Sequence, residues 1–258
     1  MNLIVPAYNG ALVNSSQIAR VMTERWTEQN FYCPACGLKL SPYPTGTKVY
    51  DFYSSDCSEK FQQKSSAHPF STSILGSEYE TTLASVLSDL HPSLILLRCD
   101  YAKHVVQDIS LIHRAYITPS CIIPRKPLAS TARRAGWRGC MISLNEVPEA
   151  GRIEVVSSGI VRDKSLILEQ WKKSSSFLTA KPELRGWLAD VLQCVERCFE
   201  TFSLANVYEF ENRLATKHPD NHNIRAKIRQ QLQVLRDMGF VEFLGSGEYR
   251  RVNSGHGR

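Results

Sequence analysis

The sequence has no apolar run that approaches the roughly 18 residues a membrane-spanning helix needs. Its start, MNLIVPAYNG, has no basic leader and no long apolar core, so it does not resemble a secretory signal. An internal repeat is absent as well. We therefore expect a soluble, intracellular protein that does not bind membranes.

Negative charge is absent from one long segment. Between Ser110 and Asn145 the sequence has no carboxylate but six cations, although the whole chain carries a net charge of only +6. Such a local excess is typical of a surface that faces phosphates, and a solvated basic loop is the alternative. The six cations are Arg114, Arg125, Lys126, Arg133, Arg134 and Arg138.

Disulfides are not expected, because thiols stay reduced inside cells. The eight cysteines should then be metal ligands or buried apolar residues, and we expect four of them to be core residues. The motif Cys33-Pro34-Ala35-Cys36 is followed after 17 residues by Ser54-Ser55-Asp56-Cys57. This spacing matches a CxxC…CxxC zinc site in which a serine replaces one ligand.

Three thiolates remain for a structural zinc ion, from Cys33, Cys36 and Cys57. A hydroxyl is a poor zinc ligand, so the fourth position is open between several candidates. The alternative is a decayed site in which the cysteines pack as small apolar residues. The candidates for the fourth ligand are Ser54, Asp56, His68 and water, and an empty fourth position is the remaining alternative.

A chain of 258 residues with 43% hydrophobic residues suits a globular protein of two domains, which we place at 1–180 and 181–258. In the first domain the apolar run from Ser93 to Cys99 is typical of a strand covered on both faces. Alternating helices and strands predict a mixed sheet flanked by helices. The other expected elements are a helix capped by Asn14, a helix from Ser77 to Leu90, and strands from Lys48 to Tyr53, Lys60 to Lys64 and Val105 to Thr118.

The second domain follows a predicted linker from Trp171 to Pro182, where a run of Lys and Ser interrupts the periodicity. Three helices and a β-hairpin predict an α+β winged helix. The helices are expected at Trp187 to Phe199, at Leu204 to Leu214 behind an N-cap at Ser203, and at Asn223 to Met238 before Gly239. The hairpin is expected at Phe240 to Val252.

Asp51 lies in one short predicted strand, while Gln62 and Lys64 lie in the next, on the same face. This is the layout of a PD-(D/E)XK nuclease, in which oxygens hold Mg²⁺ and the lysine orients the attacking water. We predict these three residues as catalytic, with Asp51, Gln62 and Gln63 as magnesium ligands. Gln62 brings no negative charge, unlike the usual carboxylate. Two surface strands with ordinary polar faces are the alternative.

Within the cation-rich segment from Ser110 to Asn145, the stretch from Pro124 to Cys140 also contains a tryptophan and several small residues, which permit a close approach to double-stranded DNA. Trp137 could stack on a base, although a lone tryptophan is more often a core residue. The predicted DNA contacts here are Arg125, Lys126, Arg133, Arg134, Trp137 and Arg138.

The last predicted helix has an apolar stripe and a polar face, as a recognition helix would. A solvated helix face is the alternative. The predicted DNA contacts are Arg225, Lys227, Arg229, Gln230 and Gln233 on the helix, and Arg250 and Arg251 on the wing.

Several long segments, taken together and in this order, resemble the DpnI (Dam-replacing) family of restriction endonucleases over about residues 15 to 251. They are FYCPACG, DFY…CSEKFQQK, ITPSCIIPRKPLASTARRAGWRGC, the GRI at Gly151, and IRQQLQVLRDMGFVEF. The resemblance implies a PD-(D/E)XK domain with a zinc site and a C-terminal winged helix, each able to read adenine-methylated GATC. It also implies a bacterial, cytoplasmic protein associated with the nucleoid, which we expect to be a monomer.

The resemblance implies catalytic roles for Asp51 and Lys64, whereas Gln62 stands where the family has Glu. It implies zinc ligation by the three cysteines, whereas Ser54 stands where the family has a fourth Cys. Trp137 matches a tryptophan of the methylated-DNA-binding loop.

We therefore predict a type II restriction endonuclease that cleaves adenine-methylated GATC with Mg²⁺ and carries a structural Zn²⁺. A methyl-DNA-binding protein without cleavage, and a nuclease with altered methylation dependence, are the alternatives.

Overall fold

The computed structural model describes residues 1–12, 14–43 and 50–252. Its largest sheet has seven strands in the order β1-β2-β3-β5-β6-β9-β10. β3 and β5 are parallel while their other neighbours are antiparallel, which confirms the predicted mixed sheet. The strands are β1 (Ser41–Pro42), β2 (Phe52–Tyr53), β3 (Lys60–Ser66), β5 (Ser93–Asp100), β6 (Val105–Ile112), β9 (Arg152–Ser157) and β10 (Ile160–Val161).

The central strand β5 is buried on both faces, as its apolar run predicts. Ile95 and Leu97 pack in one core with α1 (Ser15–Asn30) and α3 (Lys164–Ser175). Leu94 and Leu96 face a second core on the opposite side of the sheet. Helix α1 begins as expected, because the Asn14 side chain accepts hydrogen bonds from the Ser16 and Gln17 amides.

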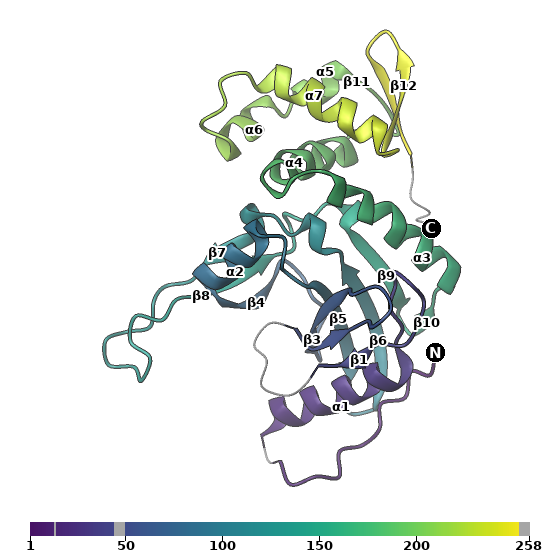
Figure 1. The fold of residues 1–258 in the computed structure, drawn as a ribbon, viewed down its shortest axis with the longest axis vertical. Helices are drawn as coiled ribbons and strands as arrows, with labels where there is room; N and C mark the ends of the chain where they lie inside the picture. The colour runs from purple at the N-terminus through teal and green to yellow at the C-terminus, as the bar shows by residue number, and fades with distance from the viewer. Residues whose placement is uncertain (13, 44–49, 253–258) are drawn as a thin grey trace.

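A smaller sheet contributes to the second core, with strands in the order β4-β8-β7. Its strands are β4 (Ser73–Glu78), β7 (Ile122–Pro124) and β8 (Gly139–Ser143), and α2 (Tyr79–Leu87) follows β4 directly. The basic segment, residues 125–138, connects β7 to β8 and extends away from the body of the molecule (Figure 1).

Some predicted bounds in this domain were wrong. The expected helix from Ser77 begins two residues later, since Ser77 and Glu78 still belong to β4. The expected strand from Val105 ends at Ile112, where short 3-10 turns begin. Of the expected strand ending at Tyr53, only Phe52 and Tyr53 are extended among the described residues, and 48–49 lie outside them.

The C-terminal domain combines four helices with a sheet in the order β11-β13-β12, as a helix-plus-sheet domain should. The expected helix from Leu204 is in fact two, because the chain turns at Glu209 and Phe210. Its N-cap Ser203 is confirmed and forms a capping box with Asn206. The elements are α4 (Pro182–Arg197), α5 (Leu204–Tyr208), α6 (Glu211–Lys217), α7 (Ile224–Asp237), β11 (Thr201–Ser203), β12 (Val241–Gly245) and β13 (Glu248–Arg251).

The expected linker before this domain is instead ordered helix. Helix α3 continues to Ser175, and a 3-10 helix spans Ser176–Thr179. Serine side chains that suggested a loop bond back to the helix, as Ser175 Oγ donates to the Trp171 carbonyl (2.9 Å). Trp171 and Phe177 are buried, so this segment belongs to the core.

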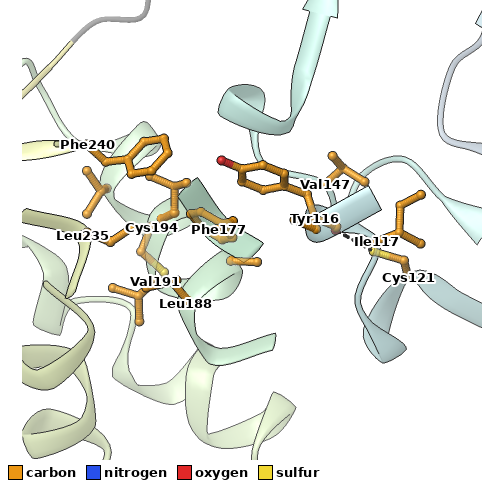
Figure 2. Packing of buried hydrophobic residues seen from close by; sticks show 14 of the residues in the cluster. Tyr116, Ile117, Cys121, Val147, Phe177, Leu188, Val191, Cys194, Leu235 and Phe240 are labelled. Carbon is orange, nitrogen blue, oxygen red and sulfur yellow. Dashed lines mark hydrogen bonds between the residues drawn. The ribbon is translucent and has the colours of Figure 1, made fainter. Parts of the chain in front are cut away.

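One hydrophobic core continues from the N-terminal half into the C-terminal domain. Figure 2 shows Tyr116 of the first half between Val147 and Phe177, with Cys194 and Phe240 of the second half beyond Phe177. The Tyr116 and Phe177 rings stack with centroids 4.1 Å apart. The two halves therefore share a packed interface and are not joined only by a linker.

Polar contacts reinforce this junction. Arg185 of α4 donates to both carboxylate oxygens of Asp89, at 2.7 and 3.1 Å. The Glu196 carboxylate accepts hydrogen bonds from the backbone amides of Glu149 and Ala150. Among the residues described, every helix is too short or too polar to span a lipid bilayer.

Candidate functional site

A cleft of about 1080 Å³ brings the predicted catalytic residues together with part of the basic segment. Asp51, Gln62 and Lys64 all line it, as do Arg134 and Trp137 from the loop between β7 and β8. These groups are up to 86 positions apart in the chain, from 51 to 137. The fold thus brings a carboxylate, an amide and an ammonium group together with cationic and aromatic side chains.

Asp51 is fixed by the strand beside it. Its backbone amide donates to the Phe61 carbonyl (2.8 Å), which places it opposite the start of β3. Its Oδ2 accepts a hydrogen bond from the Gln63 amide (2.8 Å), and its Oδ1 lies 3.3 Å from Arg20 Nη2. With an exposed side-chain fraction of 19%, the carboxylate remains open to the cleft.

Strand alternation separates Gln63 from its neighbours. Gln62 and Lys64 share one face of β3, while the Gln63 Oε1 accepts a hydrogen bond from Thr27 Oγ1 of α1 (2.6 Å). The Gln63 side chain is therefore engaged with α1 and is not free to ligate an ion.

Lys64 is largely shielded from solvent. Burial lowers the pKa of its ammonium group, and the nearby Asp51 carboxylate opposes that shift. A shielded cation next to a carboxylate interacts more strongly with a phosphate than a solvated one does, because less water screens its charge.

Arg20 and Glu24 also line the cleft, and the sequence analysis missed both. Arg20 Nε lies 2.5 Å from the Glu24 carboxylate, and the same guanidinium reaches Asp51. Burial raises the pKa of the Glu24 carboxyl. Their i, i+4 spacing on a predicted helix was the available signal, but it is common on solvated helix faces.

The three predicted zinc ligands form a compact cluster. The sulfurs of Cys33, Cys36 and Cys57 all lie within 4.8 Å of one another. Ser54 is buried beside them, with its Oγ 3.4 Å from Cys36 Sγ. Three sulfurs and a nearby hydroxyl suit a metal such as zinc. Neither Asp56 nor His68 joins this cluster among the described residues.

All eight cysteines are free. The expectation of four core cysteines holds, because four others are buried in apolar surroundings. They are Cys99, Cys121, Cys140 and Cys194.

Most of the basic segment is exposed, including Arg125, Lys126 and Arg133. The Arg134 guanidinium lies over the Trp137 ring, 4.8 Å from its centroid, and Arg138 lies over Tyr79 at the same distance. Arg114 does not belong to this surface. Its guanidinium bonds Asp89 (2.6 Å) inside the molecule, so one of the six cations was wrongly assigned to a phosphate-facing surface.

Helix α7 buries its apolar stripe and exposes a polar face, as predicted. Arg225 pairs with Glu211 (2.8 Å), Arg229 donates to the Tyr208 hydroxyl (2.7 Å), and Lys227 donates to Gln230 (2.9 Å). The exposed residues of the face include Gln230 and Gln233.

The two wing arginines differ. Arg250 is exposed and lies 3.3 Å from Glu242. Arg251 instead donates to the Glu196 carbonyl (2.8 Å), so its guanidinium points toward α4.

Family models match almost the whole chain. The model of the Dam-replacing family matches residues 5–180, and that of the Dam-replacing HTH domain matches residues 183–251. The two matches follow the order of the two halves described above. The chain therefore belongs to the DpnI (Dam-replacing) family.

Proposed function

We propose that this protein is a type II restriction endonuclease that hydrolyses double-stranded DNA at adenine-methylated GATC sites with Mg²⁺. One observation carries the proposal: a single cleft holds Asp51, Gln62 and Lys64 together with Arg134 and Trp137. Family membership supports it, since a Dam-replacing protein with an HTH domain is suited to methyl-directed restriction.

The donor atoms in the cleft suit magnesium, because it prefers oxygen ligands. Asp51 and Gln62 would hold the ion through side-chain oxygens, and Gln63 through its main chain, since its side chain bonds Thr27. When bound, Mg²⁺ polarises the scissile phosphate and makes a water more acidic. Lys64 would orient that water and stabilise the charge that develops on the phosphate.

Both halves of the molecule would contact DNA. The basic segment would hold the duplex at the cleft, with Trp137 beside the methylated bases and the arginines on phosphates. Helix α7 would enter the major groove through its exposed polar face, with Arg250 on the backbone. We propose that the protein does this as a monomer in the bacterial cytoplasm, near the nucleoid.

The cysteine cluster would hold a structural zinc ion, with the Ser54 hydroxyl or a water in the fourth position. The site would tie the end of α1, through Cys33 and Cys36, to the turn between β2 and β3, through Cys57. Since Asp51 directly precedes β2, zinc would stabilise the position of the catalytic carboxylate.

A plasmid assay tests the proposal. Plasmid from adenine-methylating and non-methylating hosts is incubated with the purified protein and Mg²⁺ or Mn²⁺ over a range of pH. We expect cleavage of the methylated plasmid alone, with cut ends that map to GATC. Intact methylated plasmid under all conditions would contradict the proposal.

A second candidate function is specific binding of methylated DNA without cleavage. Gln62 favours it, because the predicted magnesium ligands then include one carboxylate only. Retention of methylated GATC duplex without any cut product would support this candidate. Cuts at unmethylated sites would instead indicate an altered methylation dependence.

A further inference from the structure

The cleft contains carboxylates beyond Asp51. Two further carboxylates line it, namely Glu24 and Glu78. The Glu78 carboxylate caps α2, because its Oε2 accepts a hydrogen bond from the Thr81 amide (2.7 Å). Glu24 is thus the second carboxylate available to an ion in the cleft.

A single guanidinium connects Glu24 to Asp51. Arg20 lies 2.5 Å from the Glu24 carboxylate and 3.3 Å from that of Asp51. The two carboxylates, with exposed fractions of 29% and 19%, therefore converge on one position that already holds a positive charge. The Arg20 side chain is 64% exposed, so it can leave that position without disturbing the core.

Helix α1 is held firmly in this place. Trp26 is fully buried, and its indole nitrogen donates to the Asn2 carbonyl (2.9 Å). Thr27 bonds Gln63, the residue between Gln62 and Lys64. Glu24 precedes Trp26 and Thr27 by two and three residues in the same helix, so the helix fixes it beside the strand that carries the predicted catalytic residues.

We infer that Glu24 supplies the carboxylate that Gln62 lacks, and that Arg20 occupies the cation position until a divalent ion displaces it. This inference rests on the proposed magnesium site. Mg²⁺ in enzymes is commonly held by one or two carboxylates, and Glu24 with Asp51 provides two. Arg20 then raises the concentration of divalent ion that the site needs, because the ion must displace the guanidinium from the two carboxylates.

The test measures metal binding directly on the full-length protein, by calorimetric titration with Mg²⁺ and with Mn²⁺. Glu24→Gln should weaken binding about tenfold or more, because a unit charge next to the ion is lost. Arg20→Gln should strengthen binding about fivefold or more, because the competing charge is lost. Glu28→Gln is the matched control, since it removes the same charge one turn later, outside the cleft residues.

A double variant distinguishes the loss of a metal ligand from misfolding. Glu24→Gln with Gln62→Glu moves the carboxylate to the other side of the site and should recover the affinity of the unmodified protein. Unchanged affinity in Glu24→Gln, or an equal loss in Glu28→Gln, overturns the inference. Absence of metal binding in the unmodified protein also overturns it.

Two outcomes distinguish the role of Glu24 in metal binding from the proposed cleavage of DNA. If the protein binds Mg²⁺ through Glu24 but leaves methylated plasmid intact, the proposed cleavage fails and the metal assignment stands. If it cuts plasmid and Glu24→Gln binds metal normally, cleavage stands and the role of Glu24 fails.

Discussion

At the scale of single residues, the charges of the cleft lie close together, as the contacts of Arg20 with Glu24 and Asp51 show. Lys64 contributes the one shielded ammonium among the three predicted catalytic residues. Its replacement removes the charge that we propose acts on the scissile phosphate, but leaves the basic segment and α7 in place.

We expect Lys64→Ala to lower the rate of cleavage at least about a hundredfold, because electrostatic stabilisation of the developing charge is lost. Binding of a methylated duplex should change little. Single-turnover cleavage and a gel-shift titration measure the two effects. Lys60→Ala, at the exposed start of the same strand, is the control and should cut normally.

The Ser54 hydroxyl lies beside the three cysteine sulfurs, where a fourth zinc ligand would be. Ser54→Cys should complete four thiolates and slow the loss of zinc to a chelator about tenfold or more, because sulfur binds zinc better than a hydroxyl does. Zinc release is followed with a colorimetric chelator. Ser55→Cys adds a thiol one residue away, where the side chain bonds Asp56 instead, and should gain nothing. Equal retention in both variants would contradict the assignment.

How well these residues could be predicted depends on how local their pattern is. The cysteine cluster follows from spacing, since two short turns fix all three sulfurs. Glu24 and Arg20 could not be distinguished from an ordinary polar helix face, because only the packing of α1 against β3 turns them toward Asp51. The role of Arg114 was misjudged for the same reason, as its partner Asp89 is remote in sequence.

At the scale of elements, the basic segment between β7 and β8 is the part most suited to phosphate contact. Arg134→Ala should weaken duplex binding for all sequences and reduce the slope of log affinity against log salt by about 1. Fluorescence anisotropy at several salt concentrations measures both quantities. Lys172→Ala on α3 removes an exposed cation outside the cleft, and a similar change in slope there would count against the assignment.

Strong periodic elements were predicted well and irregular ones poorly. The run from Ser93 to Cys99 and the stripe of α7 each carry a clear apolar pattern, and both elements are present. The break between α5 and α6 at Glu209 and Phe210 contains neither Gly nor Pro, so no local signal marked it. The expected linker failed because buried Trp171 and Phe177 outweigh the polar residues between them.

At the scale of the whole molecule, two buried histidines make stability depend on pH. Burial lowers the pKa of His91 to about 4 and that of His113 to about 3. Below about pH 6.5 the unfolded chain takes up protons that the folded protein does not. These two groups therefore make the protein less stable as the pH decreases. We expect each histidine to cost about 2 kcal/mol of stability between pH 6.5 and pH 5. The buried Glu196 carboxyl, whose pKa is raised to about 7, offsets about 2 kcal/mol of that loss, because it takes up a proton more readily in the folded protein.

Urea unfolding at pH 7 and pH 5 measures this loss. His91→Gln cannot take up the proton and should reduce the loss of stability on acidification by about 2 kcal/mol, while His113 and Glu196 keep their contributions. A variant as sensitive to acid as the unmodified protein would show that other groups dominate.

The junction between the halves gives a second prediction at this scale. Arg185 is nearly buried, and its removal leaves Asp89 with Arg114 as the remaining partner. Arg185→Ala should lower the free energy of unfolding by about 2 kcal/mol, because the nearly buried guanidinium loses its packing and its hydrogen bonds to Asp89 and to the Ala180 and Leu178 carbonyls. Arg197→Ala, an exposed change in the same helix, should be nearly neutral. Chemical denaturation compares the two, and equal effects would contradict the role of the junction.

The continuous core also limits which chimaeras can be made by exchanging one half of the protein for the same half of a relative. Family matches end at residue 180 and resume at 183, which invites the exchange of one half for that of a relative. Tyr116, Phe177 and Phe240, however, pack across that boundary, so a chimaera would join faces that were never fitted to each other. An exchanged half should function only when the residues that face it across the junction are exchanged too. A working chimaera must therefore be designed from the contacts at the junction and not from the boundary in the sequence.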